Sequence, residues 1–326
     1  MIRKTHPGAG LALFIALAAF AGPGASAADD YPNRPIRMIV GFAPGGGTDL
    51  TARPVAQKLS ELLKQQVIVE NKPGAAGNIA TEQVARAAPD GYTILLGTIA
   101  ALAINPSLYG NLKYDPEADF LPVIQVVDAT NVLVLHPSVQ ANSVQELIAL
   151  AKQKSLSAGS SGIGATGHLS IELFNLMAGV KLVHVPYKGG GPAMTDLVGG
   201  QVQLIFATAA SAVPQIKAGR IKGIAVTTIK RSALMPDLPT LSEAGLTGFD
   251  ANNWYGLVVP AKTPRAIVEL LNAEVTKILH MPDVKASLFT QGLDPAPGTP
   301  EQFGAYMKSE RVKWARVIKE SGAKPE

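Results

Sequence analysis

The chain has 326 residues, of which 47% are hydrophobic and 17% charged, and it contains no cysteine. This apolar fraction excludes an intrinsically disordered chain, and the length fits about two domains. The absence of cysteine excludes disulfides, thiolate metal sites, cysteine nucleophiles and thiol-linked lipid. The net charge of +4 is too small to produce the field of a nucleic-acid-binding surface.

The first 27 residues have the pattern of a signal peptide. Arg3 and Lys4 supply a positive n-region, residues 11–21 are apolar, and residues 25–27 (Ala-Ser-Ala) form a small-residue cleavage site. A buried N-terminal helix is the alternative, but the three features occur in the order that export requires. An apolar run of 11 residues is too short for a membrane anchor, which takes about 20. We therefore expect a soluble protein located in a bacterial periplasm.

From residue 35 onward, β-rich runs alternate with segments of helical periodicity. We expect strands at 36–40, 67–69 and 92–96, with helices at 51–63 and 78–88 between them. This β-α-β-α-β order indicates a parallel sheet with helical crossovers. Pro54 is compatible with the first helix if Thr51 is its N-cap, because proline fits the first helical turn.

A second alternating block begins near Asn131. We expect its strands at 132–135, 156–158, 182–185, 202–206 and 221–226, and its helices at 165–178, 192–198, 213–218 and after the N-cap Ser143. The last third contains a strand at 254–259 and helices that open at residues 263–264 and 299–300. Ser143 with Glu146, and Thr299 with Gln302, have the spacing of a capping box.

This order predicts an α/β protein of two lobes joined by two crossing strands, with a ligand cleft between the lobes. Lobe 1 comprises residues 28–128 and 229–326, because the tail returns to the first block, and lobe 2 comprises residues 129–228. Ligand sites in open α/β sheets lie at the carboxyl ends of the strands. The loops that follow each strand are therefore the candidate binding loops.

A glycine-rich loop follows the first strand and precedes the first helix. Its amides and the helix dipole point to one place, which is typical of an anion site, whereas a plain connection rarely needs three consecutive glycines. No Lys-Ser/Thr follows the last glycine, so it is not a Walker A loop. We expect Asp49 to cap backbone amides or hold the loop, since it would repel an anion. The candidate residues are Phe42, Ala43, Gly45, Gly46, Gly47, Thr48 and Asp49, with Gly77 and Asn78 after the second strand and Thr98 after the third.

In the second block, a Gly/Ser-rich loop opens the helix at 165–178. It contains a formal dinucleotide fingerprint, but the acidic residue that should follow about 20 positions on is missing. We interpret this loop as a second anion site that faces the first across the cleft. Lys188 either pairs with a ligand carboxylate or is solvated or paired with Asp196. The candidate residues here are Ser160, Ser161, Gly164, Ala165, Thr166, His168, Tyr187, Lys188 and Thr208.

Signals of enzymatic chemistry are weak. The histidines lack metal-ligand spacing, and neither HExxH nor G-x-S-x-G occurs. A hydrolase that uses Ser161 and His168 is kept as an alternative from another class of function. We expect no catalytic residues, no metal and no cofactor.

Several motifs together resemble one known family. They are the run 42–49, Val69-Glu70-Asn71-Lys72-Pro73-Gly74, Pro89-Asp90-Gly91-Tyr92, Asn105-Pro106, Tyr114-Asp115-Pro116, His184-Val185-Pro186-Tyr187-Lys188-Gly189, Pro239-Thr240, and Trp254-Tyr255-Gly256. In these motifs the chain is similar to the Bug-type extracytoplasmic solute-binding proteins of the tripartite tricarboxylate transporter family. The resemblance extends over nearly all of residues 31–322.

The resemblance implies a periplasmic binding protein fold, type II-like, and a non-enzymatic function. It implies that the loop at 42–49 holds a ligand carboxylate and that the loop at 160–166 grips the other side. The implied ligand is a small carboxylate (a di- or tricarboxylate, an acidic amino acid or an aromatic acid), and the implied partners are membrane transporter subunits. We expect a monomer that does not bind nucleic acid. A sensor subunit that presents its ligand to a signalling receptor is the alternative within the same fold.

The signal-peptide pattern gives the first testable prediction. Cleavage after Ala27 should leave a soluble chain of 299 residues that begins with Ala28-Asp29-Asp30. Intact-mass measurement of periplasmic material should show the loss of the first 27 residues. Recovery of the full-length mass from a washed membrane fraction would contradict both cleavage and solubility.

Overall fold

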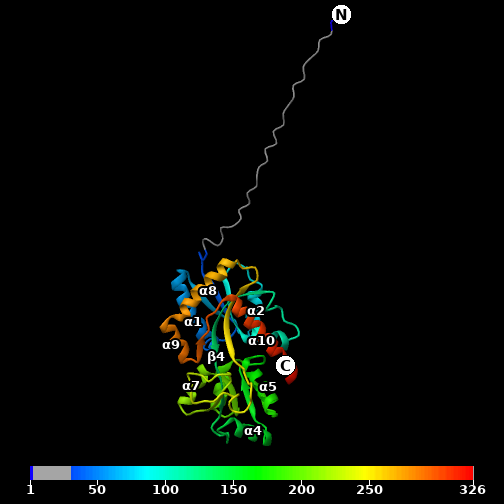
Figure 1. The fold of residues 1–326 in the computed structure, drawn as a ribbon, viewed down its shortest axis with the longest axis vertical. Coiled ribbons are helices and arrows are strands. Elements are labelled where there is room, and N and C mark those ends of the chain that lie inside the picture. The colour runs from blue at the N-terminus through cyan, green and yellow to red at the C-terminus, as the bar shows by residue number, and fades with distance from the viewer. Residues whose placement is uncertain (3–30, 326) are drawn as a thin grey trace. The chain divides into compact units, whose positions relative to one another are not determined.

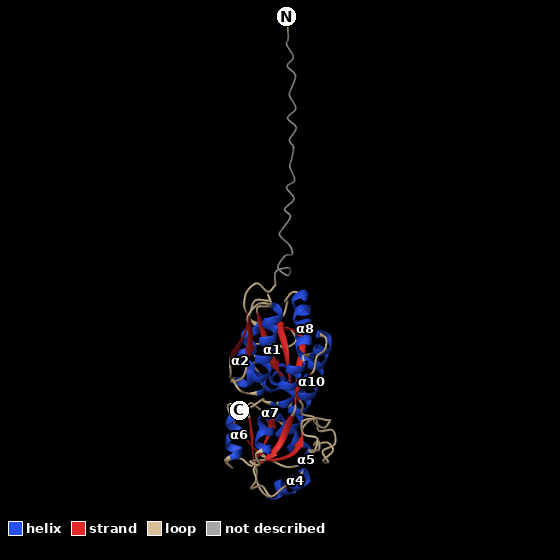
Figure 2. Ribbon diagram, turned by 90° about the vertical axis from the view of Figure 1, so that its left-hand side faces the viewer, coloured by secondary structure: helices blue, strands red, loops and turns tan. Residues whose placement is uncertain are grey.

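The computed structural model describes residues 1–2 and 31–325, and from Pro32 onward the chain forms one compact unit. This unit contains two β-sheets, each flanked by helices (Figures 1 and 2). The predicted class, α/β with two lobes, is therefore confirmed. Residues 3–27 of the predicted signal peptide lie outside the described residues.

The first lobe is built on a six-stranded sheet with the order β11-β4-β10-β3-β1-β2. Strand β1 pairs in parallel with β2 and β3, so the carboxyl ends of these three strands lie at the same edge. Strand β10, from the last third of the chain, runs antiparallel between β3 and β4. The strands are β1 (Ile36–Val40), β2 (Val67–Asn71), β3 (Thr93–Thr98), β4 (Phe120–Ala129), β10 (Asn253–Pro260) and β11 (Leu293–Pro295).

The second lobe is built on a five-stranded sheet with the order β7-β6-β8-β5-β9. Strand β6 pairs in parallel with β7 and β8, while β5 is antiparallel to β8 and β9. The loops after β6, β7 and β8 therefore also lie at one edge. The strands are β5 (Asn131–Leu135), β6 (Ser157–Ser160), β7 (Val183–Pro186), β8 (Leu204–Thr208) and β9 (Lys222–Val226).

Helices α1, α2 and α8–α10 belong to the first lobe, and α4–α7 to the second (Figure 1). Short helical turns η1 (Ala75–Gly77), η2 (Ala100–Ile104) and α3 (Asn105–Leu108) lie near the strand ends of the first lobe. The long helices are α1 (Gly47–Leu63), α2 (Asn78–Ala85), α4 (Val144–Gln153), α5 (Thr166–Ala178), α6 (Gly190–Val198), α7 (Ala209–Lys217), α8 (Arg265–His280), α9 (Pro282–Thr290) and α10 (Pro300–Ser321).

Strand β10 is buried along its whole length and separates two layers of helices. Trp254 meets the Phe303 ring of α10 edge-on, with ring centroids 5.5 Å apart. On the same face, a Cβ on Gly256 would overlap the Phe303 ring, so only glycine fits there. Tyr255 points to the opposite face, toward the first turn of α1. The last third of the chain therefore contributes the strand between β3 and β4 of the first sheet.

The predicted strands and helices occur in the predicted order, but β4, α9 and β11 were not predicted, and the predicted start of α1 is wrong. The helix begins at Gly47 and not after Thr51, so Pro54 lies inside the helix and not in its first turn. The missing proline N–H leaves the carbonyl of Leu50 without its helical hydrogen bond. Separately, the hydroxyl of Thr51 donates to the carbonyl of Gly47 at 2.8 Å. The Thr299–Gln302 capping box is formed as predicted.

The chain passes between the sheets at residues 129–131 and again within residues 227–252. At the first passage the amide of Ala209 donates to the carbonyl of Thr130 at 2.9 Å, and the amide of Thr130 donates to the carbonyl of Gly292 at 3.2 Å. These bonds join residues from three distant parts of the chain. The lobe boundaries predicted from the sequence stay a prediction.

A half-buried carboxyl group, that of Asp128, lies directly before the first passage. Gln125 Nε2 and Asn252 Nδ2 both donate to its Oδ1 at 2.8 Å. Asp294 of β11 is its cross-strand partner. Burial raises the pKa of Asp128 to about 6, and the negative charges of Asp294 and Glu310 add to this increase.

Asp128 should make the stability of the fold depend on pH. The pKa of Asp128 is higher in the folded chain than the usual 3.8. The contribution of Asp128 to the free energy of unfolding is therefore greatest at low pH and is lost as the pH rises from about 4 to about 6. Asp128→Asn mimics the protonated form and should raise the free energy of unfolding by about 3 kcal/mol at pH 7.5, but very little at pH 4.

Urea unfolding of both proteins at the two pH values measures this difference. Asp237→Asn is the control, because Asp237 is exposed and lies in a turn outside both sheets. If Asp128→Asn raises the free energy of unfolding equally at both pH values, the raised pKa of Asp128 is contradicted.

Candidate functional site

The first turn of α1 is an uncapped helix N-terminus at the carboxyl edge of the first sheet. Its N-cap is Gly46, and no side chain accepts a hydrogen bond from the first amides. Gly45 has φ +81°, which favours glycine, and a Cβ on Gly47 would lie only 2.7 Å from the Tyr255 hydroxyl. Backbone amides and the helix dipole together favour an anion at this place.

Asp49 holds this loop in shape. Its Oδ2 accepts from the Gly45 amide at 3.0 Å and from Arg53 Nε at 2.9 Å. Its Oδ1 accepts from Arg53 at 2.8 Å and from Asn71 Nδ2 at 3.1 Å. Burial raises the pKa of Asp49, but these hydrogen bonds outweigh burial and keep the pKa below its usual value. The carboxylate is thus ionised and fully occupied, in agreement with the holding role expected from the sequence.

Four buried polar side chains lie together beneath this helix N-terminus. Thr98 and Tyr255 are cross-strand partners, and Asn253 lies two residues before Tyr255 on the same face of β10. Asn253 Nδ2 donates to the Tyr255 hydroxyl at 3.2 Å, and Thr48 also hydrogen-bonds to that hydroxyl. Thr98 Oγ1 and Asn253 Oδ1 are buried and have no hydrogen-bond partner among the described residues. We call these four residues the polar pocket floor.

The second predicted loop, at Gly77 and Asn78, packs directly against the first. A Cβ on Gly41 would lie 2.7 Å from the Gly77 backbone, and a Cβ on Gly77 would lie 3.4 Å from the Phe42 ring. Asn78 Oδ1 accepts from Asn105 Nδ2 and from the Tyr114 hydroxyl, both at 2.7 Å. Asn78 is therefore held by the protein, as part of a network that continues to α3.

In the second lobe, the hydroxyl of Ser160 is occupied within its own loop. It accepts from the Gly162 amide at 3.1 Å and lies 2.6 Å from His184 Nε2. The His184 ring stacks on His168 with centroids 4.2 Å apart. Burial lowers the pKa of His168 to about 3 and that of His184 to about 4, so both rings are neutral at neutral pH.

The arrangement of His168 does not support hydrolysis by Ser161. His168 Nδ1 accepts from the Gly164 amide at 3.2 Å, so the ring proton is on Nε2, which lies 3.8 Å from Glu172. Among the described residues, neither Ser161 nor His168 contacts the other through a hydrogen bond. In this loop the serine that meets a histidine is Ser160, which lies 2.6 Å from His184 Nε2, and that pairing holds the loop.

The two lobes touch near Asn78 of the first lobe and Gly164 of the second, which the sequence analysis predicted as ligand-binding residues. A Cβ on Gly164 of the second lobe would lie 2.5 Å from Asn105 Oδ1 of the first lobe. Nearby, the Tyr109 hydroxyl donates to the carbonyl of Ile163 at 3.3 Å. Asn105 also binds Asn78, so it links the second predicted loop to Gly164. The structure thus brings Asn78 and Gly164 close, through a residue that the sequence analysis did not single out as a ligand.

The remaining candidates lie at the same strand ends but are held differently. Ala165 and Thr166 form the N-cap and first residue of α5, and no side chain caps that helix. The Tyr187 hydroxyl donates to Asp196 at 2.7 Å. Thr208 Oγ1 lies 3.2 Å from Ser211 Oγ at the start of α7, and Thr208 pairs with Asn131 next to the first passage.

Sequence reasoning missed four residues of this region: Asn105, His184, Asn253 and Tyr255. Three belong to motifs that were recognised without a role, namely Asn105-Pro106, His184-Val185 and Trp254-Tyr255. Asn253 gave no signal, because its importance comes from the return of β10 beside β3.

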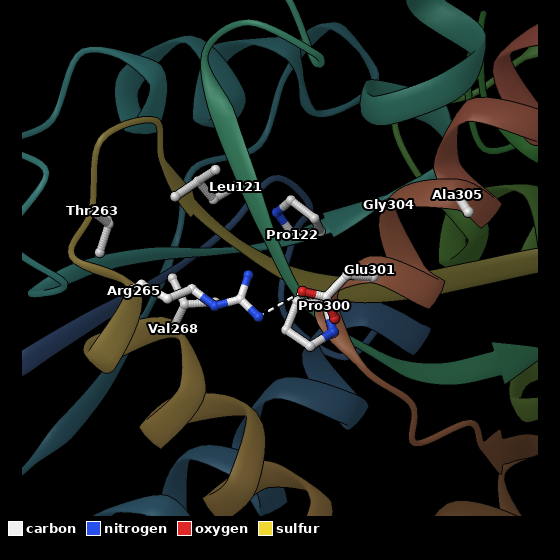
Figure 3. A pocket seen from close by; sticks show the side chains of 9 residues that line it. All are labelled: Leu121, Pro122, Thr263, Arg265, Val268, Pro300, Glu301, Gly304 and Ala305. Carbon is white, nitrogen blue, oxygen red and sulfur yellow. Dashed lines mark hydrogen bonds and ion pairs between the residues drawn. The ribbon is translucent and has the colours of Figure 1, made fainter.

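A separate hollow of about 270 Å³ lies between the start of β4 and the first turns of α8 and α10 (Figure 3). Its charged groups are paired with each other, since Arg265 and Glu301 are 2.6 Å apart. It contains none of the candidate loops. In the described part of the chain, no cluster of side chains has a metal-binding arrangement, and no helix has the length and apolarity to span a membrane.

Comparison with known proteins defines the family. The family model of the tripartite tricarboxylate transporter family receptor matches residues 51–323, so the chain belongs to this family. Protein BugT of Bordetella pertussis is 38% identical over 317 residues, which cover 96% of this chain and 97% of BugT. The family and its solved relatives are solute-binding proteins and not enzymes.

Two solved structures share the fold at high similarity. The periplasmic binding protein BugD has a TM-score of 0.84 and 38% identity, covering 91% of this chain and 100% of BugD. Rhodopseudomonas palustris Rpa4515 with adipate has a TM-score of 0.87 and 38% identity, covering 91% of this chain and 100% of Rpa4515. The resemblance to Bug-type proteins inferred from sequence motifs is confirmed.

The contact between Gly164 and Asn105 gives a prediction about lobe closure. Gly164→Ala should prevent the lobes from approaching as closely as they do here. Asn105 is fully buried and is held by Asn78, so it cannot turn away without losing that bond. The radius of gyration from small-angle X-ray scattering should increase relative to the wild-type protein.

Gly179→Ala is the matched control, because Gly179 also has a positive φ but has no atom within 4 Å of the added Cβ. Both variants should lose about 1 kcal/mol of stability from backbone strain. An unchanged radius of gyration in Gly164→Ala would show that this contact does not limit closure.

Proposed function

We propose that the chain captures a small organic carboxylate between its two lobes in the periplasm and delivers it to the membrane subunits of a tripartite tricarboxylate-type transporter. Membership of the receptor family supports the transport role, and the adipate in the Rpa4515 structure supports the ligand class. The periplasmic location is supported by BugD, which is a periplasmic binding protein of the same fold.

One observation carries the proposed ligand position. Thr98 Oγ1 and Asn253 Oδ1 are buried without protein partners beneath an uncapped helix N-terminus. A buried polar atom without a partner costs about 1–3 kcal/mol, so such atoms are retained where a bound group satisfies them. We place one ligand carboxylate at the first turn of α1, above the polar pocket floor.

The second lobe closes on the ligand from the other side. We propose that the loop at Ser160–Thr166 and the first turn of α5 contact the distal part of the ligand. Gly164 and Asn105 meet in the closed form, which is the form that satisfies donors of both lobes at once. The proposed lobes are residues 28–128 with 229–326, and residues 129–228.

The ligand class is tested by a thermal-shift screen of mono-, di- and tricarboxylates beside neutral sugars and polyamines. Stabilisation should come from carboxylates, and delivery is then tested by uptake of the identified carboxylate in cells that lack this chain. A screen in which only sugars or polyamines stabilise the protein contradicts the proposal.

The ligand position is tested with Thr98→Val. Without ligand, the variant should be as stable as wild type or more stable, because the hydroxyl it loses has no protein partner. Calorimetric titration with the best carboxylate should show affinity reduced by about tenfold or more, since a hydrogen bond to a charged group is worth about 1.5–3 kcal/mol.

Thr263→Val is the matched control. Its hydroxyl is also buried but donates to the carbonyl of Pro260 at 2.7 Å, outside the site. This variant should lose about 1 kcal/mol of stability and keep the wild-type affinity. If Thr98→Val binds as tightly as wild type, the carboxylate does not lie above the polar pocket floor.

A further inference from the structure

Lys188 lies beside the second-lobe binding loop. It follows β7, whose carboxyl end lies next to that of β6. The amide of the preceding residue, Tyr187, donates to the carbonyl of Ser160 at 3.0 Å. On the other side, a Cβ on Gly162 would lie 3.2 Å from the Tyr187 carbonyl oxygen. The backbone that carries Lys188 is thus fixed against both ends of the Ser160–Gly162 turn.

The charge of Lys188 has no partner of opposite charge among the described residues, and its side chain is exposed. The carboxylate that could neutralise it from its own loop is that of Asp196. That carboxylate instead accepts from the Tyr187 hydroxyl at 2.7 Å. The sequence left open whether Lys188 pairs with Asp196, and the structure shows a different partner for Asp196.

Within the loops after β1, β2, β3, β6, β7 and β8, Lys188 is the one lysine or arginine that has no ion pair with another described residue. The loops after β1, β3, β6 and β8 contain neither lysine nor arginine. The loop after β2 contains Lys72, which lies 3.6 Å from Glu70. In α1, Arg53 of the second turn is bound to Asp49 of the first turn. A carboxylate at α1 therefore meets neutral donors, and a second negative charge would find a cation at Lys188.

The glycines after Lys188 are the N-cap and the first residues of α6. Gly189 has φ +135°, and a Cβ on Gly189, Gly190 or Gly191 would have no atom within 4 Å. The surrounding packing therefore does not require glycine at 190 or 191. The open surroundings and the long, flexible lysine side chain suit a group that must reach ligands of different length.

We propose that Lys188 recognises the second negative charge of the ligand and so selects dianionic over monoanionic carboxylates. The proposal rests on the carboxylate-binding function proposed above. The first carboxylate is bound by neutral amides and hydroxyls of the first lobe, and Lys188 contributes a full positive charge to the other end of the ligand. Discrimination then follows from charge, which salt screens.

The test compares Lys188→Gln with Lys181→Gln by calorimetric titration. Lys181 is also exposed and without an ion pair in the described chain, but it precedes β7 and so lies at the opposite end of the strand. The probes are the linear dicarboxylates from malonate to adipate, each compared with its monomethyl ester. Lys188→Arg, which keeps the charge, is the conservative variant.

Lys188→Gln should weaken the binding of the best dicarboxylate about fivefold at low salt and leave the binding of its half-ester within about twofold. This difference should shrink in about 1 M salt, where the Debye length falls to about 3 Å. Lys181→Gln and Lys188→Arg should bind both probes as wild type does.

The outcomes separate this inference from the proposed function. If wild type binds carboxylates and Lys188→Gln binds them equally tightly, the role of Lys188 is overturned and the proposed function is not. An equal loss for dicarboxylate and half-ester, or an equal loss in Lys181→Gln, also overturns it, because the effect then does not report the second charge. If wild type binds none of the carboxylates, the proposed function fails and this inference fails with it.

Discussion

The close approach of Gly47 to the Tyr255 hydroxyl is the constraint on which the site depends. It places the first turn of α1 directly over β10, where a Cβ at residue 47 would lie 2.7 Å from that hydroxyl. The helix N-terminus thereby lies above Thr98 and Asn253, which come from β3 and β10. Three segments, from α1, β3 and β10, thus build one polar pocket floor, and Thr48 and Tyr255 lie about 200 residues apart in the sequence.

Neutral donors dominate the electrostatics of this site. The one buried carboxylate of the loop, Asp49, is neutralised by Arg53 and shapes the backbone without repelling an anion. Amides at a helix N-terminus bind an anion without the desolvation cost that a buried cation would carry. A site of this kind accepts a carboxylate readily but distinguishes poorly between ligands of different charge, so charge selection requires a separate group such as Lys188.

The second lobe is organised around polar groups that satisfy one another. Ser160, His184 and His168 are buried or half-buried, and both rings are kept neutral by burial. Their hydrogen bonds hold the Gly162–Gly164 turn in the shape that meets Asn105. Ser160 and His184 have the residue types of a catalytic pair but not its arrangement. The Ser160 hydroxyl already accepts a hydrogen bond from a backbone amide, and the His184 ring is stacked on His168.

The sequence by itself determined the α/β alternation, the two blocks and the glycine-rich loops, because strand and helix periodicity and glycine at turns are local properties of the chain. It did not determine where α1 begins, because Gly47 enters the helix through its contact with Tyr255 and not through a local cap. Strand β4 was not predicted either, since residues 120–129 pair only with β10 and β11 from the last third of the chain. Asn105 and Asn253 became part of the candidate site for the same reason. Their neighbours are distant in sequence, and only the tertiary structure brings these polar groups to one edge of the sheet.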